Sequence, residues 1–248
     1  LEMTTYYEQR EDETFARQKE IFDRLGQQVL CVFDVGANVG QSIQAYRALF
    51  PDCSIRAFEP NPATFEPLRA AHGAADGVTL EPIGLADRDG RLPFYATRVP
   101  EVASLLKPAD RLVRLSTEHK YDYELIEVSC CTLDGYCQRN GIDQIDIAKL
   151  DVQGNELAVL QGASNMLRNG AISLLYLEII IAESYDRQSG MAPILNLMTE
   201  HGYALWEIMP FLYTTPGRVW TANAIFISRQ MTVMLEDDGA GINTRREE

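Results

Sequence analysis

Four acidic residues lie at the ends of apolar runs that have the length of buried β-strands. They are Asp34, Glu59, Asp151 and Glu178. In a doubly wound sheet, the carboxyl ends of the parallel strands meet at one edge, and ligands bind there. An ionised carboxylate buried without a partner is unfavourable, so acids at these positions indicate a site. Such a site suits a cationic or hydroxyl-rich ligand, and one of its carboxylates can accept a proton from a reacting hydroxyl.

The first of these acids precedes a glycine turn, from Gly36 to Gly40, that leads into a helix at about Gln41. Glycine gives the backbone freedom for a tight turn, and the first amides of a helix bind a carboxylate or phosphate. A dinucleotide-binding turn needs glycine at its first, third and sixth positions, whereas here the third is Asn38 and the sixth is Gln41. The turn therefore fits a nucleoside ligand without phosphates. S-adenosylmethionine is such a ligand, because its carboxylate suits the helix amides and its positive groups favour Asp34.

The spacing of Glu59 and Lys149 adds to this interpretation. Glu59 lies about twenty residues after the glycine turn, the usual offset of an acid that accepts hydrogen bonds from ribose hydroxyls. Lys149 alternates with Asp151 along its strand, so the two face the same side and can form a functional or a purely structural ion pair. Asp34 also has an alternative role, because its side chain can cap the turn that follows it.

Strands that alternate with helices must position these residues, and this alternation predicts βαβ units and a parallel sheet. The main strands are expected at residues 29–35, 54–58, 78–84, 145–151, 172–178, 203–208 and 223–228. Helices are expected at residues 12–25, 41–49, 64–71, 155–167 and 192–201. Residues of about 88–140 interrupt this rhythm with two short strands, which indicates an inserted β elaboration within the same domain.

The predicted fold class is therefore α/β, with a doubly wound, Rossmann-like sheet that is seven-stranded and mostly parallel. One domain is expected over residues 29–230, preceded by a helical extension over residues 1–28. Residues 231–248 are expected to form a polar tail.

Composition excludes several classes of function. The chain has 248 residues and a formal net charge of -14, and it lacks the basic stripe of a nucleic-acid-binding surface. The longest apolar run, at residues 172–182, contains Glu178 and is too short to span a membrane. Without a signal pattern, a cytoplasmic location is expected. The five cysteines lack the spacing of a zinc site or a disulfide framework and are expected to be reduced thiols.

Four segments stand in a characteristic order: FDVGANVG at 33–40, AFEP at 57–60, IGLAD at 83–87 and KLDVQGNE at 149–156. Together with LE at 177–178 and NAIF at 223–226, they resemble the FkbM-type family of class I S-adenosylmethionine-dependent methyltransferases. The resemblance implies methyl transfer to a hydroxyl of a small molecule, sugar or lipid-like acceptor, and a seventh strand antiparallel beside the sixth. Gln153 departs from the family pattern, which has an acid there in many members. This departure argues against a metal ligand or a base at position 153.

The candidate binding residues lie at the predicted strand ends and in two loops. Those expected to hold the cofactor are Asp34, Gly36, Ala37, Asn38, Gly40, Glu59, Pro60, Gly84, Leu85 and Asp151. Those expected to contact the acceptor are Ser104, in the inserted segment, and Glu183 and Tyr185, after the fifth strand.

The catalytic candidates are Asp151, as the first choice of general base, Glu178, as the second, and Lys149. No metal is expected, although Asp151, Asn155 and Glu178 offer oxygen ligands of the kind that Mg²⁺ prefers. Positioning of the two reactants is expected to contribute more than the base, at about 7–11 kcal/mol against about 10²–10⁴-fold in rate.

Two other classes of function share part of this pattern. A nicotinamide-dependent oxidoreductase would have the same strand, turn and Glu59, but it would need the glycines that are missing here. A domain that binds the cofactor without catalysis is the second alternative, and it gives no reason for the acids at the later strand ends.

Overall fold

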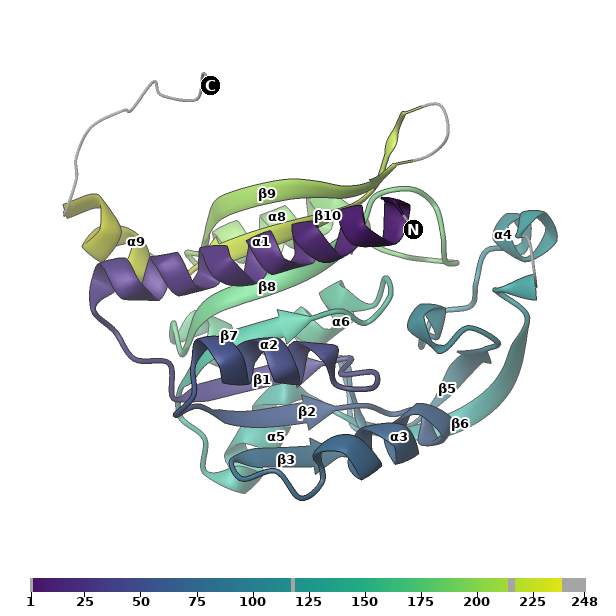
Figure 1. The fold of residues 1–248 in the computed structure, drawn as a ribbon, viewed down its shortest axis with the longest axis horizontal. Coiled ribbons are helices and arrows are strands. Elements are labelled where there is room, and N and C mark those ends of the chain that lie inside the picture. Colours follow the sequence, from purple (N-terminus) through teal and green to yellow (C-terminus); the bar gives the residue numbers. More distant parts are fainter. Residues whose placement is uncertain (1, 117–118, 214–216, 238–248) are drawn as a thin grey trace.

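The structure is a computed structural model, and we describe residues 2–116, 119–213 and 217–237 of it (Figure 1). Its centre is a seven-stranded sheet with the strand order β3-β2-β1-β7-β8-β10-β9. The strands are β1 (Cys31–Val35), β2 (Ser54–Phe58), β3 (Val78–Glu81), β7 (Ile145–Leu150), β8 (Ile172–Ile180), β9 (Ala204–Tyr213) and β10 (Val219–Ile227). This arrangement confirms the predicted α/β fold class.

The direction of the strand order reverses at β1, and the candidate site lies there. β1 pairs in parallel with β2 on one side and with β7 on the other, and β7 pairs in parallel with β8. β10 runs antiparallel between β8 and β9, as the family resemblance implies. Ligands of open α/β sheets bind at such a reversal, beyond the carboxyl ends of the strands.

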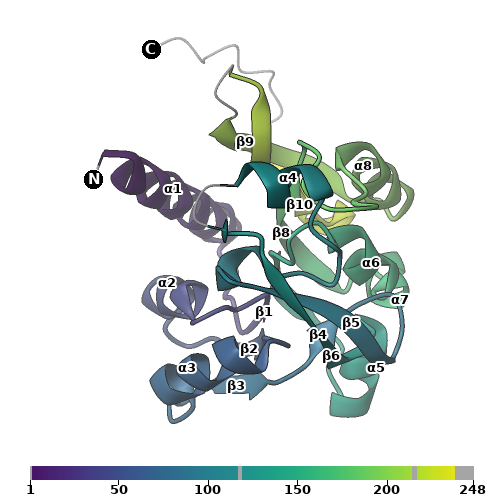
Figure 2. The same cartoon turned by 90° about the vertical axis from the view of Figure 1, so that its right-hand side faces the viewer.

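Helices cover both faces of the sheet (Figure 2). The helices on one face are α1 (Glu2–Leu25), α2 (Gln41–Leu49), α3 (Pro62–His72) and α9 (Arg229–Asp237). Those on the other face are α5 (Leu133–Asn140), α6 (Glu156–Gln161), α7 (Ser164–Arg168) and α8 (Met191–Glu200). The strands read as nearly continuous apolar runs because both faces are buried.

The inserted segment forms a second sheet beyond the carboxyl ends of β1, β2 and β7 (Figure 1). Its strands are β4 (Gly84–Leu85), β5 (Gly90–Thr97) and β6 (Tyr123–Cys131), in the order β4-β6-β5. Between β5 and β6 the chain forms a short 3₁₀ helix, η1 (Pro100–Val102), and the helix α4 (Asp110–Leu115). This segment therefore covers the carboxyl ends of these strands, where the candidate site lies.

Several elements differ from the prediction. The helix predicted at 155–167 is two helices, α6 and α7, with a break at Gly162. At this break the backbone passes so close to Ala86 that a Cβ at position 162 would lie 2.1 Å from the Ala86 carbonyl oxygen. The strand predicted at 78–84 ends at Glu81, and β4 joins the second sheet instead. Helix α1 begins ten residues earlier than expected, and α4 and α5 were not predicted.

The expected polar tail also differs, because residues 231–237 belong to α9 and bury Met231 and Leu235 against α1 and the sheet. The rest of that tail, 238–248, lies outside the described residues. Within the described part of the chain, no helix combines the length and the apolar character needed to cross a membrane.

Candidate active site

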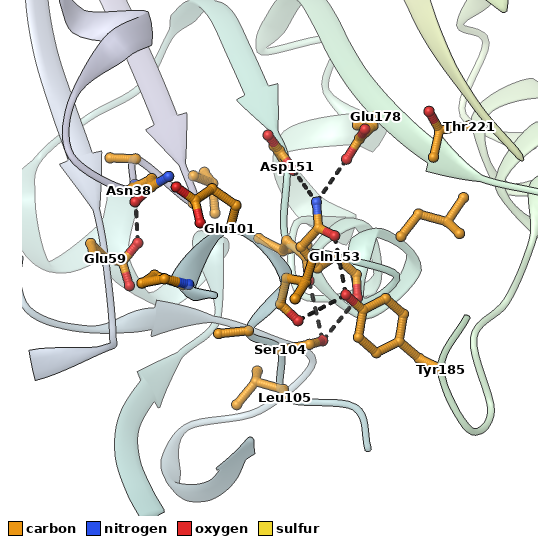
Figure 3. A pocket seen from close by; sticks show the side chains of 18 of the residues that line it. Asn38, Glu59, Glu101, Ser104, Leu105, Asp151, Gln153, Glu178, Tyr185 and Thr221 are labelled. Carbon is orange, nitrogen blue, oxygen red and sulfur yellow. Dashed lines mark hydrogen bonds between the residues drawn. The ribbon is translucent and has the colours of Figure 1, made fainter. Parts of the chain in front are cut away.

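A cavity of about 520 Å³ opens at the carboxyl ends of β1, β2, β7 and β8, and the residues of η1 also line it (Figure 3). Its lining includes Gly36, Ala37, Asn38, Glu59, Pro60, Gly84, Leu85, Ser104, Lys149, Asp151, Glu178 and Tyr185. Twelve of the residues proposed from sequence thus line one cavity, although they come from three strands and five loops.

The glycine turn lies tightly between two strand ends. Gly36 has φ +83°, and a Cβ there would fall 1.9 Å from the Asp151 carbonyl oxygen, so only glycine fits. The backbone N–H groups of Gly36 and Ala37 both donate to the Phe58 carbonyl at 3.0 Å. These contacts direct the turn toward the start of α2, whose first residues line the cavity and which has no side-chain cap. Its free amides are available to an anionic group.

Gly40 lies outside the cavity lining, contrary to the prediction. It begins α2 with φ +96°, and a Cβ there would lie 2.4 Å from the His72 ring. Its absent side chain therefore serves the packing of α2 against α3, not contact with a ligand.

Glu59 is 93% buried at the end of β2, with both carboxylate oxygens held in place. Oε2 accepts from the Asn38 backbone N–H at 3.0 Å, and Oε1 accepts from the Asn61 N–H at 2.8 Å. Burial raises the pKa of Glu59 to about 7, while these two hydrogen bonds act in the opposite direction. The remaining lone pairs face the cavity and suit a ligand that donates hydroxyl protons.

Asp34 lies below the cavity and does not line it, so the predicted contact with a ligand is corrected. Because Asp34 and Lys149 are register partners on β1 and β7, their side chains meet. Lys149 Nζ lies 3.3 Å from Asp34 Oδ1 and 3.6 Å from Asp151 Oδ2. Burial raises the pKa of Asp34, and Lys149 acts in the opposite direction. Lys149 thus links a buried acid to one that faces the cavity.

Gln153 bridges the two strand-end carboxylates (Figure 3). Its Nε2 donates to Asp151 Oδ1 at 2.9 Å and to Glu178 Oε2 at 2.8 Å. Its backbone adopts φ 53°, a left-handed conformation uncommon outside glycine. The pKa of Glu178 is raised well above its ordinary value by burial and then by the charge of Asp151. Sequence analysis treated Gln153 only as a departure from the family pattern, and its bridging role depends on this backbone turn.

Two hydroxyls, those of Ser104 and Tyr185, connect Gln153 to the inserted segment between β5 and β6. Ser104 Oγ donates to the Gln153 carbonyl at 2.8 Å. The Tyr185 hydroxyl lies 2.9 Å from the Val102 carbonyl and 3.1 Å from Gln153 Oε1, and it donates its single proton to one of them at a time. Both residues line the cavity, but these bonds position the chain. Glu183 is exposed and does not line the cavity, which corrects its prediction as an acceptor contact.

Several residues that line the cavity were not among those proposed from sequence. Examples are Glu101, Tyr121, Trp220, Thr221 and Asn223. Asn223 belongs to the NAIF segment that carries the family resemblance, and Thr221 precedes it by two residues, which places both on one face of a strand. This two-residue spacing was the sequence signal that could have indicated Thr221 as a partner of Asn223 in the cavity wall. Glu101 and Tyr121 lie in the inserted segment, where no periodicity indicates the fold.

Residues 34–205 match the family model described as the Methyltransferase FkbM domain. The chain belongs to the FkbM methyltransferase family. It is therefore an S-adenosylmethionine-dependent methyltransferase, and this sets aside the two alternatives weighed above.

Curated relatives in this family are 27% or 28% identical to the chain over the aligned residues. The 2-O-methyltransferase NoeI of Sinorhizobium fredii is 27% identical over 67% of this chain and 70% of its own length. The 31-O-demethyl-FK506 methyltransferase FkbM of Streptomyces tacrolimicus is 28% identical over 70% and 72% of the two chains. The hexuronic acid methyltransferase AglP of Haloferax volcanii is 28% identical over 56% and 52%.

Proposed function

We propose that this methyltransferase transfers the methyl group to a hydroxyl of a small-molecule or sugar acceptor, with Asp151 as the general base. The observation that carries the proposal is the carboxylate pair Asp151 and Glu178, held by Gln153 at the wall of the cavity. Three relatives whose names specify O-methylation or a hexuronic acid substrate support the choice of a hydroxyl acceptor.

The cavity suits S-adenosylmethionine, which supplies a methyl group on a positively charged sulfur. Asp151, Glu178 and Glu59 line the cavity with Lys149, which is already paired with Asp34. This excess of acid favours a ligand with cationic groups. Glu59 would hold the ribose hydroxyls, the first amides of α2 would hold the carboxylate, and Gly84 and Leu85 would border the adenine.

The environments of the two carboxylates assign them different roles. The pKa of Glu178 is raised well above its ordinary value by burial and then by the charge of Asp151, which favours the protonated form of this side chain. Asp151 is 36% exposed to the cavity, and its Oδ1 is occupied by Gln153. Its Oδ2 lies 3.6 Å from Lys149 Nζ, beyond hydrogen-bond distance, and is the oxygen that would accept the acceptor's proton. Two carboxyl groups in different environments can divide the roles of acid and base.

We also propose that this pair works without a metal ion. The two amide protons of Gln153 occupy the space between Asp151 and Glu178, where a cation would need both carboxylates. Turnover should persist after incubation with EDTA, and loss of turnover that Mg²⁺ restores would contradict the proposal.

The test of the base is Asp151→Asn, with methyl transfer and cofactor binding measured separately. We expect kcat to fall by about 10²–10⁴-fold. The affinity for S-adenosylhomocysteine, measured by calorimetric titration, should remain within a few-fold of the parent. Full turnover in Asp151→Asn would show that Asp151 is not the base. A parent chain that binds NAD and not S-adenosylhomocysteine would overturn the proposed function itself.

A further inference from the structure

Two neutral polar residues of β10 lie opposite the carboxylate pair. Asn223 is the cross-strand partner of Glu178, and Thr221, two residues earlier, lies on the same face of the strand. Side chains of directly paired antiparallel residues have Cβ atoms about 4.5–5.5 Å apart. Both residues line the cavity, and Thr221 lies beside Glu178 in Figure 3. A group held at Asp151 and Glu178 therefore has β10 as its neighbour.

The hydroxyl of Thr221 lacks a hydrogen-bond partner among the residues that the structure describes. The residue is 4% exposed, and its Oγ1 is buried without a donor or acceptor. A buried hydroxyl without a partner is unfavourable, and native folds satisfy nearly all such groups. Since Thr221 lines the cavity, the partner of its hydroxyl is expected on a ligand bound there.

Thr64 provides a matched comparison on α3. It is also 4% exposed, and its Oγ1 is also buried without a partner in the described part of the chain. Thr64 does not line the cavity. The two threonines therefore share burial and chemistry and differ in whether a ligand in the cavity can reach them.

We infer that Thr221 and Asn223 form a subsite for a second oxygen of the acceptor, on the carbon next to the hydroxyl that is methylated. The inference rests on the proposed function, because Asp151 defines where the reacting hydroxyl lies. Threonine and asparagine are uncharged and both donate and accept hydrogen bonds, so their complement is a hydroxyl or carbonyl oxygen. The acceptor class is then a compound with oxygens on neighbouring carbons, such as a sugar ring, and not an isolated alcohol.

The experiment uses the full chain and matched small probes. Transfer of a labelled methyl group is measured to methyl hexopyranosides, to cyclohexanediols with hydroxyls on neighbouring carbons, and to cyclohexanol. We expect kcat/KM for the glycosides and diols to exceed that for cyclohexanol by about tenfold or more. Thr221→Val and Asn223→Ala should each lower this preference about 5- to 10-fold, mainly through KM, since each removes one hydrogen bond. Thr64→Val should keep the preference of the parent.

A stability measurement separates binding from folding. Because the Thr221 hydroxyl has no partner in the described part of the free chain, Thr221→Val should keep or raise the urea midpoint. A lowered midpoint would mean that the hydroxyl has a structural bond, and the inference would fail.

The kinetic outcomes distinguish the inference from the proposed function. The inference is also overturned if cyclohexanol is methylated as well as the diols, or if Thr221→Val keeps the preference. A parent chain that binds S-adenosylhomocysteine but methylates none of the glycosides and diols overturns the inference alone. A parent chain that does not bind S-adenosylhomocysteine overturns the proposed function as well.

Discussion

Replacing Gln153 with glutamate tests whether the bridge between Asp151 and Glu178 controls their ionisation. The substitution keeps the length of the side chain but removes the amide Nε2, which donates to the two carboxylates at 2.9 Å and 2.8 Å. It also adds a third carboxyl group, and like charges at this distance disfavour ionisation. Burial and the charge of Asp151 already raise the pKa of Glu178, so the new group acts in the same direction.

The size of the effect follows from the hydrogen bonds that are lost. A hydrogen bond to a charged group contributes about 1.5–3 kcal/mol, which corresponds to about one to two pKa units at about 1.36 kcal/mol per unit. The base must be ionised to accept a proton, so activity is lost below the acid limb of the pH profile. We expect Gln153→Glu to move that limb of kcat/KM upward by at least about one unit. At pH values below both limbs the loss is about tenfold for each pH unit that the limb moves, and it is recovered as the pH rises through the new limb.

The assay is the pH profile of labelled methyl transfer, with S-adenosylhomocysteine affinity and the thermal midpoint measured on the same samples. Gln144→Glu is the matched control, because Gln144 is exposed before the start of β7 and bonds to Ser173. Gln153→Ala should shift the limb in the same direction by a smaller amount, since it adds no charge. An unchanged acid limb in a folded Gln153→Glu variant that still binds S-adenosylhomocysteine would refute the reasoning.

Three further substitutions probe the floor of the cavity. Gly36→Ala places a Cβ 1.9 Å from the Asp151 carbonyl oxygen, so urea denaturation should show a loss of more than about 2 kcal/mol. Glu59→Gln should weaken S-adenosylhomocysteine binding about tenfold or more. Because the pKa of Glu59 is about 7, the affinity of the parent should fall as the pH drops below that value, and a titration series should show no such fall for Glu59→Gln. Lys149→Met leaves Asp34 buried without its ion-pair partner and should lower the unfolding free energy by about 3–5 kcal/mol. The double variant Lys149→Met/Asp34→Asn, which removes the buried charge as well, should recover most of this loss.

Local patterns were sufficient to predict the main sheet. Strand β2 is predicted at its observed bounds, Ser54–Phe58, because a short apolar run bounded by turn residues has few alternatives. The break at Gly162 was not predictable in the same way, since it depends on close approach to Ala86, a residue distant in sequence. Helix α9 was missed because its buried residues, Met231 and Leu235, stand among charged and polar residues.

In the candidate site, too, local sequence patterns do not predict which way the side chains point. Asp34 stands beside the glycine turn that lines the cavity, but its own side chain pairs with Lys149 and does not line the cavity. Which strands pair with β1 decides this, and strand pairing is not a local property. Glu183 and Tyr185 are neighbours in one loop, yet one is exposed and the other is buried against Gln153 and Val102. A loop sequence without periodicity does not indicate which of its side chains turns inward.

The contacts of Gln153 explain why an amide, and not an acid, suits position 153. A proton that leaves the acceptor needs a carboxylate that is ionised beforehand and can hold the proton afterwards. Under our proposal, Asp151 is the base and the raised pKa of Glu178 favours its protonated form, while the amide of Gln153 donates to both without adding charge. An acid at position 153 would leave three carboxyl groups to share these protons, and the ionised form of the base would be less favourable. Under our proposal, the amide of Gln153 is therefore what allows Glu178 to hold a proton while Asp151 accepts one.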